Sequence, residues 1–95
     1  MPEITHDPEA TRFTVDTEVG TARLDYILSP GLIVLSHTEV PVGAEGRGLA
    51  SALAKAGLDY ARAQGLRVMP LCPFVAGYIR RHPEERDLLM PGISV

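Results

Sequence analysis

The segment from Leu32 to Gly65 changes from an extended to a helical pattern across a turn that contains three glycines. Residues 32–40 (LIVLSHTEV) begin apolar on both faces and end polar, which is typical of a strand that leaves the core. From Leu49 onward, apolar residues recur at intervals of three and four, and this period predicts a helix that ends at Gly65. Glycine weakens a first helical turn but lets the backbone approach a bulky anion, so the turn predicts an anion site.

Three classes of phosphate ligand use a strand, a glycine-rich turn and a helix N-terminus. A nucleoside triphosphate loop requires G-x-x-x-x-G-K-[ST], and no Lys-Ser/Thr pair follows the glycines here. A dinucleotide fold requires G-x-G-x-x-G and an acid about 20 residues later. Ser51 replaces the third glycine, and the next strand, RVMPL, contains no acid. The pyrophosphate of coenzyme A is the third class.

The remaining segments predict a small mixed sheet. Residues 67–71 follow the long helix, so a crossover is expected to bring them beside residues 32–40 in parallel. Pro30 and Gly31 predict a tight turn with a positive φ at the glycine. Residues 1–10 are expected to be a loose lead-in, with His6 in solvent, before one domain over residues 11–95. The predicted strands cover residues 12–16, 21–28, 32–40 and 67–71, and the predicted helices cover 46–64 and 74–82.

Composition argues against several classes of protein. The chain has 95 residues, a net charge of −3 and no basic stripe, so nucleic-acid binding is disfavoured. It has no long apolar run for a membrane span, and an acidic N-terminus unlike a secretory signal. The single cysteine fits a reducing, cytoplasmic location. The three histidines lack metal-ligand spacing, so no metal site is expected. We expect a monomer or a weak dimer.

The turn and the helix that follows it resemble a known family. EGRGLASAL resembles the Q/R-x-x-G-x-G/A motif of the GNAT acetyltransferase superfamily, with Glu45, Gly48 and Ala50 at the defining positions. The ordered set HTEVP, GRGLASAL, LDYARAQGL and PLCPFVAGYIRRHPE is similar to the compact GNAT-like family of N-acetyltransferase domains, over residues 10–86. Glu45 departs from the pattern, because most relatives have Arg or Gln there; Arg47 is a candidate to compensate.

The resemblance implies an α/β fold: a reduced GNAT fold with an antiparallel meander, one parallel strand pair and two helices. It implies an acetyl-CoA-dependent N-acetyltransferase that acts on a primary amine of an unknown small-molecule or protein acceptor. The alternatives are a non-catalytic module that binds CoA or acyl-CoA, and a structural domain without a cofactor. The acceptor side is expected to be open, since the chain has no room for the extra N-terminal helices of longer relatives. The implied cofactor-binding residues are Glu39, Val40, Val42, Gly46, Arg47, Gly48, Leu49, Ala50 and Ser51. The first three are implied to contribute backbone groups to the pantetheine arm rather than side chains.

Two residues are candidates for catalysis. Cys72 follows the last strand, where a thiolate could accept the acetyl group, with His37 as its base. The alternative is a small buried residue behind the cofactor, and most GNAT enzymes transfer acetyl directly. Tyr78 stands where many relatives have a tyrosine that protonates the departing thiolate; the alternative is a packing role. His37 and Glu39 are also candidate proton relays, although a structural role is favoured for both.

Overall fold

The computed structural model describes residues 2–95 and contains a five-stranded sheet with the order β1-β2-β3-β4-β5. The first four strands pair antiparallel, and β5 pairs with β4 in parallel. This arrangement confirms the predicted meander and parallel pair. The elements are β1 (Thr5–Asp7), β2 (Arg12–Thr17), β3 (Gly20–Ser29), β4 (Leu32–Glu39), α1 (Leu49–Gln64), β5 (Arg67–Pro70), α2 (Pro73–Arg81) and the 3-10 helix η1 (Pro83–Leu88).

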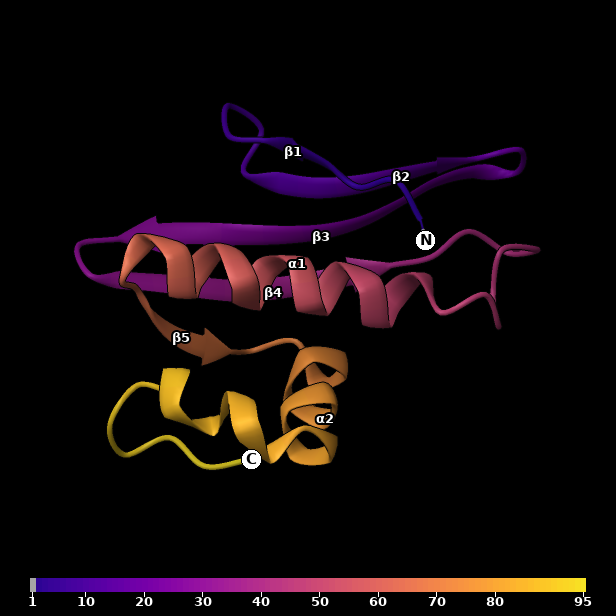
Figure 1. The fold of residues 1–95 in the computed structure, drawn as a ribbon. Coiled ribbons are helices and arrows are strands. Elements are labelled where there is room, and N and C mark those ends of the chain that lie inside the picture. Colours follow the sequence, from indigo (N-terminus) through magenta and orange to yellow (C-terminus); the bar gives the residue numbers. More distant parts are fainter. Residues whose placement is uncertain (1) are drawn as a thin grey trace.

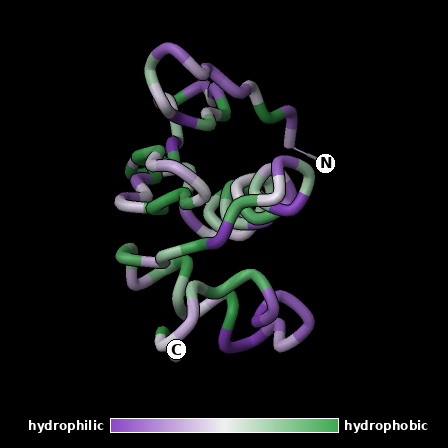
Figure 2. The backbone as a smooth tube through the Cα atoms, turned by 90° about the vertical axis from the view of Figure 1, so that its left-hand side faces the viewer, coloured by the Kyte–Doolittle hydropathy of each residue, from purple (hydrophilic) through white to green (hydrophobic). Residues whose placement is uncertain are grey.

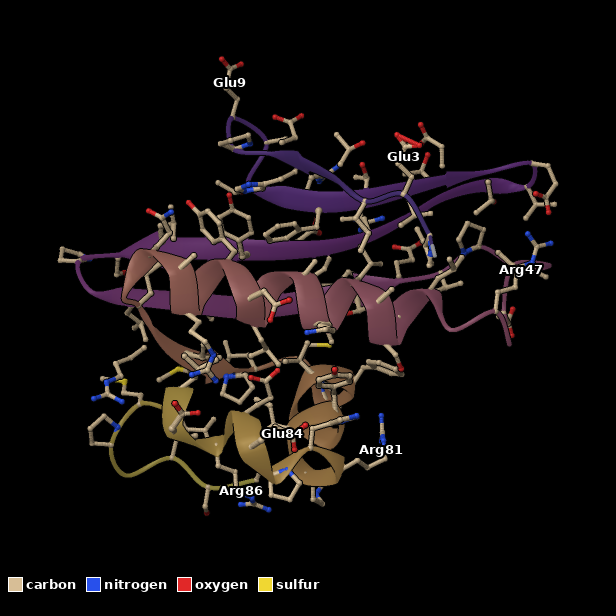
Figure 3. The ribbon with its side chains drawn as sticks, in the orientation of Figure 1. Glu3, Glu9, Arg47, Arg81, Glu84 and Arg86 are labelled. Atoms are coloured by element: carbon tan, nitrogen blue, oxygen red, sulfur yellow. The ribbon has the colours of Figure 1, made fainter. Side chains whose placement is uncertain are left out.

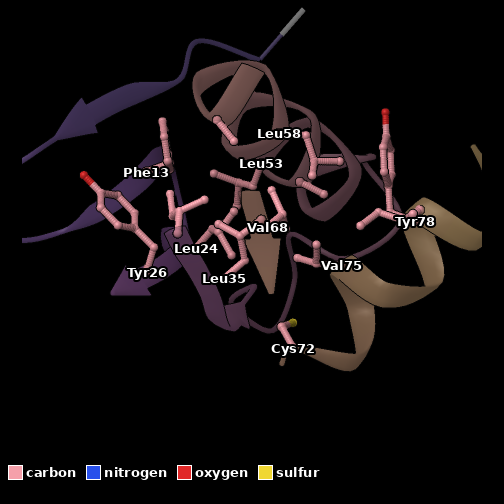
Figure 4. Close-up of a cluster of buried hydrophobic side chains, with 14 of the residues drawn as sticks. Phe13, Leu24, Tyr26, Leu35, Leu53, Leu58, Val68, Cys72, Val75 and Tyr78 are labelled. Carbon is pink, nitrogen blue, oxygen red and sulfur yellow. The ribbon is translucent and has the colours of Figure 1, made fainter. Parts of the chain in front are cut away.

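Helix α1 lies along the sheet, and its apolar stripe forms the core with β2, β3 and β4 (Figures 1 and 4). Gly57 sets how closely the helix approaches, because a Cβ there would lie 3.0 Å from the Cδ2 of Leu24. In a side view, hydrophobic stretches of the chain surround α1 and hydrophilic stretches follow the outer turns (Figure 2). The small residue at this position therefore permits close packing of the helix on the sheet.

The expectation of a loose segment over residues 1–10 is wrong at β1, which pairs with β2. His6 is half-buried rather than solvated: its ring stacks on Phe13 with centroids 4.3 Å apart, and its Nε2 lies 2.6 Å from the hydroxyl of Tyr26. The aromatic cluster also includes Tyr60 of α1. These contacts are distant in sequence, so they hold a short edge strand that local pattern does not reveal.

The C-terminal segment, which the sequence left unassigned, is tied to α1 by an ion-pair cluster. Arg62 donates to the carboxylates of Glu85 and Asp87 at 2.8–3.0 Å, and Arg67 donates to the Asp87 carbonyl at 2.8 Å. Leu88 is buried in the core, so η1 closes the edge of the sheet beyond β5. None of the described helices is long and apolar enough to cross a membrane.

Candidate functional site

A β-bulge divides β4 into two halves that face different ways. Tyr26 pairs with Leu35 and Asp25 pairs with His37, so Ser36 is an extra residue. Before the bulge, Ile33 and Leu35 point into the core. After it, Thr38 faces the same side as the core while His37 points to the opposite face. The bulge therefore places the Thr38 side chain at the end of the core rather than on the outer surface.

The same strand loses its partner just beyond the bulge. Pairing with β5 ends at Leu35 and Pro70, and the N–H of Cys72 donates to the carbonyl of Leu35 at 3.0 Å. The chain then turns into α2, and in the described structure no strand pairs with the β5 side of β4 after Leu35. The two parallel strands thus separate at their carboxyl ends, where open α/β sheets bind ligands.

A cavity of about 340 Å³ lies at this separation. It extends from the end of β4, past the glycine-rich turn and the start of α1, to the start of α2. Most of its walls are backbone and apolar side chains, as in typical small-molecule sites. The lining residues are Thr38, Val40, Ala44, Glu45, Gly46, Gly48, Leu49, Ala50, Ser51 and Phe74.

The turn adopts a conformation that requires glycine. Gly43, Gly46 and Gly48 have φ angles of 95°, 79° and 75°, and Gly48 is the N-cap of α1 without a side-chain cap. A Cβ on Gly46 or Gly48 would meet no protein atom within 4 Å. Protein packing therefore does not explain these two glycines, whereas the left-handed backbone and the adjacent open space do.

The first turn of α1 offers hydrogen-bond donors to the cavity. The first intrahelical bond runs from Ala52 N to the carbonyl of Gly48 at 3.0 Å, so the preceding N–H groups have no helical acceptor. The first turn contains no acidic side chain that would occupy them. These amides and the positive end of the helix dipole form a favourable environment for an anion.

Six of the nine predicted cofactor-binding residues line the cavity. Glu39, Val42 and Arg47 do not. The Glu39 side chain pairs with Arg23 at 2.7 Å, on the opposite face of the sheet from Thr38, and Val42 is exposed. Arg47 forms an ion pair with Glu18 and donates to the carbonyl of Gly43 at 3.2 Å. The cavity is also lined by Glu45, the first position of the family motif, and by three residues that were not predicted: Thr38, Ala44 and Phe74.

Glu45 brings a negative charge to the cavity wall, as its departure from the family motif suggested. Arg47 does not offset this charge, because its guanidinium forms an ion pair with Glu18. The hydrogen bond between them raises the pKa of Arg47 and lowers the pKa of Glu18. An anion in this cavity must therefore depend mainly on backbone amides.

The two catalytic candidates are both buried, and neither lines the cavity. Cys72 Sγ lies 3.2 Å from the Oγ1 of Thr38, within hydrogen-bond distance for sulfur, so its contact with the cavity is indirect. Tyr78 stacks on His82 with centroids 4.0 Å apart, and its ring extends away from Cys72 (Figure 4). Burial and the charge of Glu85 raise the pKa of Tyr78, which keeps the phenol protonated.

The suggestion that His37 acts as the base for Cys72 is wrong. His37 is exposed on the face opposite Thr38, with its Nε2 3.5 Å from the Oε2 of Glu39. Glu39 belongs in turn to a row of charges in which Arg23 also contacts Asp25 at 3.1 Å. The bulge causes this separation, and the sequence gives no local signal for it.

Comparison with known proteins identifies the family of this chain. The family described as GCN5-related N-acetyl-transferase matches residues 12–88. Protein NATD1 of Gallus gallus is 31% identical over 85 residues, which cover 85% of this chain and 76% of that protein. Protein NATD1 of Homo sapiens is 31% identical over 84 residues, which cover 84% of this chain and 74% of that protein.

A solved structure shares the fold. It is an NMR structure of a GCN5-like protein from Staphylococcus aureus, named as a candidate N-acetyltransferase, with a TM-score of 0.68 and 24% sequence identity. The match covers 93% of this chain and 87% of that one. Because the family pattern spans most of the sequence and the relatives exceed 30% identity, this chain belongs to the GCN5-related N-acetyltransferase family.

Proposed function

We propose that this domain binds acetyl-CoA and transfers its acetyl group to a primary amine. The observation that carries the proposal is the cavity in which the free amides of the first turn of α1 meet the unpaired end of β4. The amides suit the diphosphate of CoA, and the unpaired β4 backbone suits the amide groups of the pantetheine arm. The thioester would then lie near Thr38.

Direct transfer is the step that we favour. The amine nitrogen attacks the thioester carbonyl, a C–N bond forms, the C–S bond breaks, and CoA leaves as a thiolate that takes up a proton. The family resemblance makes Tyr78 the candidate proton donor, and its phenol is protonated at neutral pH, although its ring does not line the cavity. The amine must lose its own proton to water or to a carboxylate on the acceptor side.

A covalent route through Cys72 is the competing mechanism. Its thiolate would attack the thioester, release CoA and hold the acetyl group as a new thioester until the amine takes it. The neighbour of Cys72 is the hydroxyl group of Thr38 rather than a base, and Cys72 does not line the cavity. Both observations favour the direct route.

Calorimetry with acetyl-CoA, followed by thioester consumption with a panel of small and protein amines, tests the function. We expect binding, and turnover with at least one amine. Cys72→Ala should retain turnover, and no acetylated protein should accumulate in intact-mass spectra. Tyr78→Phe should lower kcat by about 10²–10⁴-fold if Tyr78 is the general acid. Tight binding without turnover for any amine would instead support a non-catalytic CoA-binding module.

A further inference from the structure

Arg81, at the end of α2, is exposed, and its guanidinium lies over a residue that lines the cavity. Its guanidinium carbon lies 5.8 Å from the centroid of the Phe74 ring, and Phe74 lines the cavity. Residues 74 and 81 are two helical turns apart, so they share one face of α2. Arg81 and Arg47 lie toward the same end of the molecule, where α1 begins (Figure 3).

Gly77 leaves room for this placement. A Cβ at Gly77 would lie 3.2 Å from the Nη1 of Arg81, so the side chain folds back over a position that has no side chain of its own. Glycine inside a helix costs roughly 1 kcal/mol relative to alanine. The gap that it leaves lets Arg81 run back along α2 and cover Phe74, which remains 38% exposed.

Two arginines of α2, Arg80 and Arg81, lie outside the salt bridges of the described residues, and Arg81 is the one whose guanidinium lies over Phe74. Glu45 is on the wall, and Arg47 is paired with Glu18. Arg81 forms no ion pair in the described part of the chain, where the salt bridges involve other arginines and Lys55. A guanidinium over an aromatic ring is suited both to stacking with a base and to bidentate contact with phosphate.

We propose that Phe74 and Arg81 recognise the 3′-phosphoadenosine end of CoA, so that the domain discriminates CoA from 3′-dephospho-CoA. This inference rests on the proposed function. With the diphosphate on the amides of α1, the pantetheine arm runs inward toward Thr38. The nucleoside must therefore leave through the mouth of the cavity. There it meets the exposed Phe74 ring, and its phosphate monoester meets the free guanidinium of Arg81.

The test compares binding of CoA and 3′-dephospho-CoA by calorimetry in the wild type, in Arg81→Gln and in Arg86→Gln. Arg86 is a matched control, because it is also an exposed arginine outside the salt bridges but lies on η1. The wild type should bind CoA about tenfold or more tightly than the dephospho form. Arg81→Gln should remove this preference and leave the affinity for 3′-dephospho-CoA near that of the wild type. Arg86→Gln should keep the preference.

The outcomes separate this inference from the function on which it rests. Equal binding of the two ligands by the wild type, or an unchanged preference in Arg81→Gln, would overturn the role of Arg81 while leaving CoA binding intact. Loss of the preference in both variants would assign it to overall charge and would also overturn the inference. Failure of the wild type to bind either ligand would remove the proposed function itself.

Discussion

Substituting the glycines at the two ends of α1 distinguishes an effect on CoA affinity from an effect on the free energy of unfolding. Gly48 precedes the helix with φ 75° and ψ 16°, and Gly65 follows it with φ 67° and ψ 31°. Both are left-handed, and a Cβ on either would meet no protein atom within 4 Å. Alanine in this conformation costs roughly 1–2 kcal/mol. Gly48→Ala and Gly65→Ala should therefore lower the free energy of unfolding by similar amounts, because each pays the same backbone strain without a steric clash.

Only one of these two substitutions adds a methyl group beside the cavity. The ends of the 16-residue helix are about 24 Å apart, at roughly 1.5 Å per residue, so Gly65 is remote from the site. The methyl group of Gly48→Ala would enter the space between the amides and a bound diphosphate. We expect this variant to bind CoA at least about tenfold more weakly, a loss equivalent to one displaced hydrogen bond. Gly65→Ala should bind like the wild type.

Thermal unfolding and calorimetry with CoA, run on both variants, decide the question. A loss of about 1 kcal/mol should lower Tm by roughly 4–8 °C in a domain of this size. If Gly48→Ala bound CoA as tightly as the wild type, the backbone of the turn would not contact the ligand. If both variants lost affinity equally, the loss would come from helix destabilisation. Either result would refute the reasoning.

Three further predictions concern the fold. Leu53 is fully buried, so Leu53→Ala should cost roughly 2–5 kcal/mol of unfolding free energy in urea denaturation. Gly57→Val should cost roughly 1–3 kcal/mol in the same assay, because its Cβ would already press on Leu24. Arg62 lowers the pKa of Asp87 below its ordinary 3.8, so the contact stabilises the fold above that pH and is lost as the pH falls. The stability difference between wild type and Asp87→Asn should therefore shrink on acidification below about pH 4.

Local signals in the sequence predicted the helices well. Gly65 closes α1 with a positive φ, as expected from its backbone preference, and α2 begins at Pro73, one residue before its predicted start. Helix α1 begins at Leu49 rather than at residue 46, because Gly46 and Gly48 are left-handed. The turn at Pro30 and Gly31 also has the predicted positive φ at the glycine. In each case one residue with a restricted or permissive backbone marks the boundary, so no long-range information is needed.

Features that depend on distant contacts were missed. The three residues of β1 are held by the ring of His6 against Phe13 and Tyr26, and nothing in THD itself predicts a strand. Phe74 lines the cavity only because α2 starts beside α1. A single sequence does not show which elements will meet, so it cannot select these side chains.

The bulge at Ser36 had the largest effect on the predicted site. Simple alternation from Ile33 and Leu35 would put His37 and Glu39 on the core face and Thr38 outside. The extra residue reverses this order, so Thr38 lines the cavity. The sequence LSHTE contains no glycine or proline that would mark the irregularity.

The bulge also determines how two substrates would meet under the proposed activity. Residues 37 and 38 point to opposite faces of β4, so the cofactor and the amine would approach the thioester from opposite sides of one strand. The amine side is exposed and carries a row in which Arg12 and Arg23 are balanced by Asp25 and Glu39. The two arginines and two carboxylates of this row cancel, so the row has no net charge that would attract a cationic amine at long range. Selection of the acceptor would therefore depend on short-range contacts with this open face, including any that the acceptor itself supplies.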